Sequence, residues 1–222
     1  ATMAALVGGG TRPQPGEVAL AHRGVLFLDE LPEFSPRVLD SLRQPLETGE
    51  ISIARANHRI SYPSRMQLVA AMNPCRCGHA FEAGRSCRRG LNCMDQYIGR
   101  ISGPLLDRID LQIEMPAVSA LDLTQPNKPE ASASVRERVI AARERQRSRC
   151  TALNLDSIRT NAEFPASKLA EIAVPDEAGR RLLQEATQKL GLTARGYHRT
   201  LRLARTVADL DQSDTVTHIH VK

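Results

Sequence analysis

Two short apolar runs in the first half of the chain each end in polar side chains. The run at 25–28 leads directly into Asp29 and Glu30, and the run at 67–72 ends at Asn73. Short continuous apolar runs are typical of strands buried on both faces of a parallel sheet. We therefore predict two buried strands that carry polar groups at their carboxyl ends, where open α/β sheets bind ligands.

Helical and hairpin patterns lie around these strands. Ser35 and Pro36 predict the start of a helix that Gly49 ends. Alternating residues on either side of a basic tip predict a β-hairpin at 51–62. Further predicted elements are a short helix at 3–7, a helix at 94–101 and a third strand at 111–115.

The pattern changes after residue 116. Prolines and small polar residues predict a linker at 117–134, and the pattern is helical beyond it. We predict an α/β domain at 1–116 followed by a small helical domain at 135–222. The helices expected there are one at 135–149, one between an Asp176 cap and Gly191, and one that begins at Thr193.

Composition and charge narrow the function classes. The 222 residues carry a net charge of +5, which permits an acidic partner such as nucleic acid without requiring one. Trp is absent and aromatic residues make up 3%, so base stacking on an aromatic platform is not expected. No apolar run approaches the roughly 18 residues of a membrane span, and no signal-peptide pattern is present. We expect a cytoplasmic protein without a membrane partner.

Asp29 and Glu30 are the first candidate catalytic residues. In folds that hydrolyse nucleotides, an acidic pair at this position holds magnesium and polarises water. Asp29 would bind the magnesium ion, directly or through water, and Glu30 would orient the attacking water. Taken alone, the same residues fit a solvated acidic turn after an ordinary buried strand equally well.

Four of the five cysteines lie close together, and the fifth, Cys150, is expected to be an unpaired thiol. In a cytosolic protein such a cluster indicates a metal site before it indicates disulfides. Four thiolates suit structural zinc, and the polar segment around them has little core of its own. The alternative is a loop with incidental reduced thiols, and His79 is a possible replacement ligand. The predicted zinc ligands are Cys75, Cys77, Cys87 and Cys93.

The order of these features resembles AAA+ ATPases. An acidic strand end, a strand ending in Asn73, the sequence Asp-Arg-Ile-Asp at 107–110 and an Arg-bearing helix follow one another. The hairpin before the Asn73 strand is similar to the clade of magnesium chelatases and replicative helicases. Individual motifs resemble the YifB/ComM-like competence protein family of magnesium-chelatase-type ATPases, namely those at 8–10, 15–17, 20–24, 31–34, 73–75, 101–104 and 195–199.

The resemblance implies an α/β core with an inserted hairpin, a helical lid domain and a role for each matching residue. Asp29 and Glu30 match the Walker B pair, and Asn73 matches sensor 1, which positions the water against the γ-phosphate. Arg108 matches the arginine finger that reaches a neighbouring subunit's nucleotide, and Arg195 matches sensor 2 of the lid. Such cations can stabilise the charge that spreads over the phosphate oxygens during transfer.

Without the family, Arg108 has a simpler interpretation. It stands between Asp107 and Asp110 in the sequence and would be expected to form an ordinary surface ion pair with one of them.

The resemblance further implies ATP and Mg²⁺ as cofactors and self-association into a ring, with six subunits expected. In the first functional hypothesis the ring acts on DNA, and Arg55, His58 and Arg59 at the hairpin tip contact phosphates. ComM-like proteins are associated with branch migration of DNA during natural transformation. In the alternative, a chelatase-type ring remodels a protein partner during metal insertion. A third hypothesis, a docking module without ATPase activity, fits poorly with four intact candidate catalytic residues.

One feature of the family is missing from the sequence. The phosphate-binding loop Gly-x-x-x-x-Gly-Lys-Ser/Thr does not occur in it. We therefore expect a fragment that lacks the first strand and this loop and whose helical domain is truncated at the C-terminus. Because the loop supplies most phosphate contacts, the fragment alone is expected to be inactive, whereas the full-length protein is expected to be an ATPase.

Overall fold

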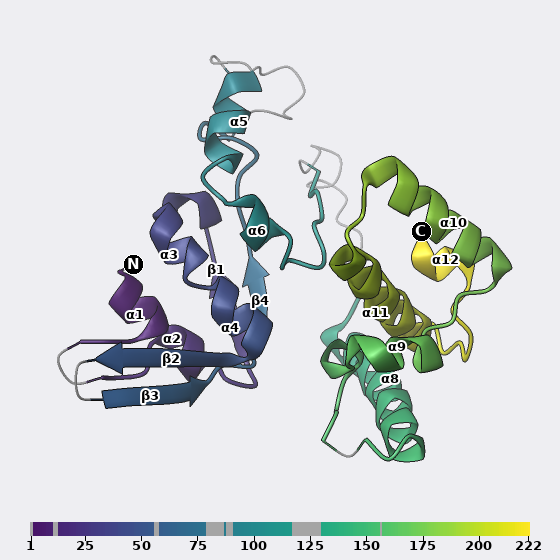
Figure 1. Ribbon diagram of the computed structural model, residues 1–222. Coiled ribbons are helices and arrows are strands. Elements are labelled where there is room, and N and C mark those ends of the chain that lie inside the picture. The colour runs from purple at the N-terminus through teal and green to yellow at the C-terminus, as the bar shows by residue number, and fades with distance from the viewer. Residues whose placement is uncertain are drawn as a thin grey trace. The chain divides into compact units, whose positions relative to one another are not determined.

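The computed structural model describes residues 2–10, 13–55, 58–78, 87, 91–116, 130–155 and 157–222. The chain divides into two compact units, Ala1–Ser119 and Ala120–Lys222, and each is described by itself. The first is mixed α/β, and the second is helical in the part of the chain that the structure describes (Figure 1). Residues 117–129 lie outside the described ranges, so the limits of the linker at 117–134 stay a prediction.

In the part of the chain that the structure describes, the first unit contains short helices and four strands. Its elements are α1 (Met3–Val7), α2 (Glu17–Leu20), β1 (Val25–Leu28), η1 (Leu31–Glu33), α3 (Pro36–Asp40), α4 (Arg43–Thr48), β2 (Glu50–Arg55), β3 (His58–Pro63), β4 (Gln67–Ala70), α5 (Leu91–Ile98) and α6 (Gly103–Leu106).

The strands form two separate pairs. β1 and β4 are parallel, with Val25 opposite Gln67 and Leu28 opposite Ala70. β2 and β3 form the predicted antiparallel hairpin. The prediction of an α/β fold with parallel strands and an inserted hairpin is confirmed.

The predicted burial of β1 on both faces is wrong. Leu26 and Leu28 are 8% and 5% exposed, whereas Val25 and Phe27 are each 58% exposed. Val69 of β4 is also 39% exposed. A strand is buried on both faces only when other elements cover both, and among the described residues the second face of this sheet is left open to solvent.

The predicted third strand at 111–115 is also absent from the described residues. This segment forms no strand, and Leu111, Ile113 and Met115 are 58%, 76% and 82% exposed. A strand exists only where a neighbour accepts and donates its backbone hydrogen bonds. No described strand pairs with this segment, so its apolar sequence alone was not sufficient to form a strand.

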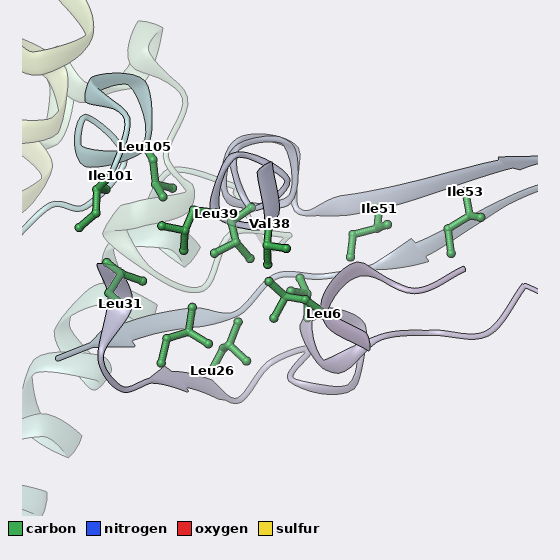
Figure 2. Packing of buried hydrophobic residues seen from close by; sticks show 12 residues of the cluster. Leu6, Leu26, Leu31, Val38, Leu39, Ile51, Ile53, Ile101 and Leu105 are labelled. Atoms are coloured by element: carbon green, nitrogen blue, oxygen red, sulfur yellow. The ribbon is translucent and has the colours of Figure 1, made fainter. Parts of the chain in front are cut away.

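The core of the first unit gathers around one face of the parallel strands. Figure 2 shows Leu26 of β1 facing Val38 and Leu39 of α3, with Ile51 and Ile53 of β2 on the same side as Leu6. The hairpin therefore packs one of its faces on the core. The buried members are Leu6, Val18, Leu26, Leu28, Leu31, Val38, Leu39, Leu42, Ile51, Ile53, Ile101 and Leu105.

The helix predicted from Ser35 to Gly49 is divided into α3 and α4. Pro45 has no N–H to donate to the preceding turn and is tolerated only in the first turn of a helix, so a new helix starts at Arg43. Gly49 ends α4 as predicted, in the left-handed conformation (φ 72°), and its N–H donates to the Pro45 carbonyl at 2.9 Å.

The second unit contains the predicted helices. Its elements are α8 (Ser132–Ala152), η2 (Asn161–Glu163), α9 (Ala166–Ile172), α10 (Glu177–Leu190), α11 (Ala194–Leu210) and α12 (His218–Val221). Asp176 caps α10 by accepting from the Gly179 N–H at 2.6 Å, and Gly191 ends it. Thr193 caps α11 through the Gly196 N–H at 3.1 Å. The first helix begins at Ser132, three residues before the predicted start.

A buried polar cluster that no local sequence pattern predicts joins α8, η2 and α11. Asp209 is fully buried and accepts from both terminal nitrogens of Arg149, at 2.5 and 3.0 Å, and from Asn161 at 2.8 Å. Arg205, 2% exposed, contacts the same carboxylate at 3.0 Å and donates to the Ser213 and Asp214 carbonyls. Burial alone would raise the pKa of Asp209, but these hydrogen bonds and positive charges outweigh it and leave the pKa lowered.

Cys150 lies in the core of the second unit. It is a free thiol, 3% exposed, and burial raises its pKa. Among the helices that the structure describes, none combines the length and apolar character needed to cross a membrane.

Candidate active site

The carboxyl ends of β1 and β4 bring three of the candidate residues to one edge of the sheet. Asp29 and Glu30 follow β1 directly, and Asn73 lies three residues beyond β4. Backbone pairing continues past the strands, because the Ala71 N–H donates to Leu28 O at 2.9 Å and the Leu31 N–H to Ala71 O at 3.0 Å. All three polar side chains are exposed, so this edge is open to a ligand.

Glu30 adopts an unusual backbone conformation at this edge. Its φ and ψ of 51° and 47° are left-handed, which costs a non-glycine residue about 1–2 kcal/mol. The Glu30 N–H donates to Asp29 Oδ1 at 2.8 Å, and η1 begins at the next residue. Strain of this kind concentrates at functional sites, and here it ends the strand just where the two carboxylates begin.

These residues have suitable chemistry for magnesium. Mg²⁺ prefers oxygen ligands, keeps several waters and is commonly bound by one or two carboxylates together with substrate phosphates. Two exposed carboxylates beside an exposed amide at one sheet edge fit such an ion. The roles assigned to Asp29, Glu30 and Asn73 stay predictions.

Arg108 lies just after α6 and its side chain is only 12% exposed. It forms an ion pair with Glu47 of α4, and its Nη1 donates to the Pro104 carbonyl at 2.6 Å. The sequence had suggested Asp107 or Asp110 as partners, and it gave no indication of Glu47. The structure thus holds the guanidinium in a defined place beside α4.

Arg195, the predicted sensor 2 residue, belongs to the second unit. It lies in the first turn of α11, directly after the Thr193 cap, and is exposed. On the same helix, Arg202 donates two hydrogen bonds to the Phe164 carbonyl, at 3.2 and 2.9 Å.

The hairpin residues lie where the sequence placed them. Arg55 and His58 are opposite each other at the last described pair of β2 and β3, and Ala56 and Asn57 lie outside the described residues. Arg59 is exposed. In the register it faces Ala54, next to the Ser52–Ser61 pair, whose hydroxyl oxygens are 2.9 Å apart. This is the hairpin face opposite the buried isoleucines, so Arg59 is accessible to a large ligand.

The four clustered cysteines converge in space. Their Sγ atoms all lie within 4.8 Å of one another, and they are the described group that could hold a metal ion. Cys75 and Cys93 are buried, Cys87 is intermediate and Cys77 is exposed. His79, the alternative ligand, lies outside the described residues.

Two residues beside the strand edge, Tyr97 and Arg100, were not found by sequence reasoning. Tyr97 of α5 is 5% exposed, and burial raises its pKa, as do the negative charges of Glu33 and Glu30. Arg100, just after α5, lies 3.5 Å from the Glu33 carboxylate. No sequence signal links residues so far apart; only the tertiary structure brings α5 beside the acidic strand end.

Comparison with protein families agrees with this architecture. The family model described as magnesium chelatase, subunit ChlI, matches residues 1–123, and the model of the ChlI C-terminal part matches residues 129–222.

Individual relatives match over all or nearly all of the chain. Competence protein ComM of Haemophilus influenzae is 46% identical over 222 residues, covering 100% of this chain and 42% of its own length. The uncharacterized protein YifB of Escherichia coli K12 is 44% identical with the same coverage. The magnesium-chelatase 38 kDa subunit of Acidiphilium rubrum is 26% identical, covering 94% of this chain and 52% of its own length.

The chain thus spans less than half the length of ComM and YifB, while all of its own residues are covered by the match. Two family models, the parallel strands with an inserted hairpin and these identities agree with one another. The chain belongs to the magnesium chelatase ChlI family of AAA+ type, together with ComM and YifB.

Proposed function

We propose that this chain is part of an AAA+ ATPase whose full-length form hydrolyses ATP to remodel DNA. The observation that carries the ATPase proposal is the meeting of Asp29, Glu30 and Asn73 at the carboxyl ends of two paired parallel strands. A carboxylate pair and an amide at one edge supply the metal-binding and water-positioning groups that phosphoryl transfer to water uses.

Each of these residues has one task in the proposal. Asp29 binds magnesium, which when present neutralises charge on the phosphate oxygens. Glu30 accepts a hydrogen bond from the attacking water and orients it, and Asn73 holds that water against the γ-phosphate. The left-handed turn at Glu30 supports this arrangement, because the Glu30 backbone N–H donates to Asp29 Oδ1 at 2.8 Å and ties the two residues together where the strand ends.

Arg108 and Arg195 supply positive charge in the proposed ring. Arg108 acts on the nucleotide of the neighbouring subunit, and Arg195 acts from the helical domain of its own chain. This requires self-association, and we propose a ring of six subunits. The fixed guanidinium of Arg108 beside α4 supports a role that depends on position.

DNA is the proposed substrate of the ring. The basic hairpin supports it, since Arg59 is exposed and Arg55 and His58 flank the tip in the backbone register. Contacts of this kind bind phosphates independently of the base sequence, and they weaken as the salt concentration rises. Similarity to a protein named for competence adds support, at 46% identity.

The alternative is a ring that remodels a protein partner during metal insertion. Its support is the similarity to a magnesium-chelatase subunit, at 26% identity. The same strand edge serves both functions, so the substrate must be tested directly.

The same proposal names the cofactors and predicts that the 222-residue chain alone is inactive. ATP and Mg²⁺ serve the full-length protein, and zinc is bound by the four cysteines, whose converging sulfur atoms support it. Because the phosphate-binding loop is absent from this sequence, the 222-residue chain by itself is expected to bind nucleotide weakly and to hydrolyse none. Steady ATP turnover by the purified chain would contradict that expectation.

The deciding experiment measures ATP turnover by the full-length protein without DNA, with single strands and with branched duplex, each at low and high salt. Stimulation by branched DNA that disappears at high salt is the expected result. Turnover that ignores DNA at both salt concentrations would instead favour the protein-remodelling ring.

Three variants separate the parts of the proposal. Glu30→Gln should retain nucleotide binding and lose turnover. Arg59→Ala should reduce DNA stimulation and leave DNA-free turnover unchanged. Arg37→Ala, which removes an exposed arginine of α3 outside the hairpin, is the matched control and should behave like the wild type.

A further inference from the structure

The spacing of the four sulfur atoms is close to that of a metal centre. Zinc bound to thiolates has Zn–S distances of about 2.3 Å, which places the sulfurs of a tetrahedron about 3.8 Å apart. The Sγ atoms of Cys75 and Cys77 are 3.1 Å apart, those of Cys77 and Cys87 are 3.2 Å apart, and all four lie within 4.8 Å. The four sulfurs therefore need only small movements to surround one ion.

The donor atoms select the kind of ion. Among the described residues the group contains four sulfurs and no histidine or carboxylate. Soft thiolate ligands in tetrahedral geometry suit zinc or an iron–sulfur centre and do not suit magnesium or calcium. Four sulfurs within 4.8 Å of one another suit one ion, and this favours zinc, which is four-coordinate in closed structural sites.

Two of the ligands connect elements on opposite sides of the cysteine segment. Cys75 lies two residues after Asn73 and is 0% exposed. Cys93 lies inside α5 and is 7% exposed. An ion bound to both would join the backbone that leaves β4 to helix α5 by two metal–sulfur bonds.

Helix α5 is in turn attached to the acidic strand end. Its Tyr97 is buried near the charges of Glu30 and Glu33, and Arg100 forms an ion pair with Glu33 at 3.5 Å. A closed path therefore runs from Asn73 through the cysteines and α5 to the turn that carries Glu30.

We propose that Cys75, Cys77, Cys87 and Cys93 bind one zinc ion that fixes the position of Asn73 relative to Glu30. Zinc is a positioning element here and takes no part in the reaction. The binding of zinc stands on the sulfur geometry alone, whereas its effect on Asn73 rests on the proposed ATPase function. The two parts are therefore tested by separate measurements.

The first measurement is metal content of the 222-residue chain, purified without chelator and analysed for zinc and iron. One zinc per chain is expected, and Cys87→Ser should reduce it several-fold. Cys150→Ala, which removes the one cysteine outside the cluster, should retain the full amount. Co²⁺ added to the metal-free chain should give the intense visible spectrum of tetrahedral thiolate coordination.

Zinc-free protein, iron in place of zinc, or equal zinc in the wild type and Cys87→Ser would overturn the metal site. Loss of zinc from Cys150→Ala to the same degree would also overturn it, since the loss would then reflect general instability.

The second measurement is ATP hydrolysis by the full-length protein with and without the Cys87→Ser substitution. A displaced Asn73 should lower kcat at least tenfold and leave KM for ATP within about twofold, because Asn73 acts on the water and the nucleotide is held elsewhere. Unchanged kcat in a zinc-deficient variant would overturn the positioning role and leave the zinc site standing. If Glu30→Gln also hydrolyses ATP normally, the proposed function has failed, whatever the metal content.

Discussion

Arg108 and Glu47 form an ion pair across 61 positions of the chain, and only 12% of the arginine side chain is exposed. Glu47 lies near the end of α4, two residues before Gly49, and the hairpin begins at Glu50. A second hydrogen bond, from Nη1 to the Pro104 carbonyl at 2.6 Å, holds the other side of the guanidinium. The proposed arginine finger is thus oriented by the element that leads into the proposed DNA-binding hairpin.

We predict that Glu47→Gln lowers ATP turnover of the full-length protein about tenfold. The loss corresponds to about one charge-assisted hydrogen bond, near 1.4 kcal/mol. Arg108→Ala should lower turnover much further, by roughly 10³-fold or more, as removal of an arginine finger does. Steady-state kinetics of both variants check this.

Glu50→Gln is the control for Glu47→Gln. It removes an exposed carboxylate three positions farther along the chain, so turnover should equal that of the wild type. Wild-type turnover in Glu47→Gln, together with an inactive Arg108→Ala, would show that the ion pair does not orient the arginine.

We predict that Asp209→Ala destabilises the second unit by about 3–5 kcal/mol. The substitution leaves the buried charge of Arg205 and the partly buried charge of Arg149 without their shared carboxylate. Urea unfolding of the 222-residue chain measures the change. As a control, Glu171→Gln breaks an ion pair with Lys168 that is 43–45% exposed and should change stability by less than about 1 kcal/mol. Equal effects of the two substitutions would contradict a special role for the buried cluster.

The lowered pKa of Asp209 predicts the direction of acid unfolding. The pKa of Asp209 is lower in the folded state than in the unfolded chain, where an Asp carboxyl has a pKa of about 3.9. Such a carboxyl contributes its full stabilisation at pH values above the unfolded pKa. This stabilisation is lost as the pH falls from there through the lower folded value. Free energies of unfolding measured between about pH 6 and pH 2.5 should therefore decline more steeply in the wild type than in Asp209→Asn. Parallel curves would argue against this assignment.

Gly49 gives a test of the junction between α4 and the hairpin. Its φ of 72° is left-handed, and an added Cβ would lie 2.7 Å from Cγ of Arg65. We predict that Gly49→Ala destabilises the first unit by about 1–2 kcal/mol. Gly103→Ala is the matched control, because no atom lies within 4 Å of its added Cβ, and it should change the unfolding midpoint in urea very little. Similar midpoints for both variants would contradict the prediction.

Local sequence determined the order of the elements and most of the candidate site. The caps at Asp176 and Thr193 and the helix end at Gly49 are where the sequence predicted them. The same holds for the polar residues after β1 and β4. Helix ends and hairpins depend on residues a few positions apart. Such features can be read directly from a single sequence.

Tertiary structure alone decided which side chains are buried and which residues they contact. Val25 and Phe27 are exposed although the run at 25–28 is apolar, and 111–115 forms no strand, because covering faces and strand partners come from distant segments. The same reason applies to Glu47 beside Arg108 and to the buried Asp209 cluster. The spacing of the cysteines indicated a metal, but only the fold of the chain brought their sulfur atoms within 4.8 Å of one another.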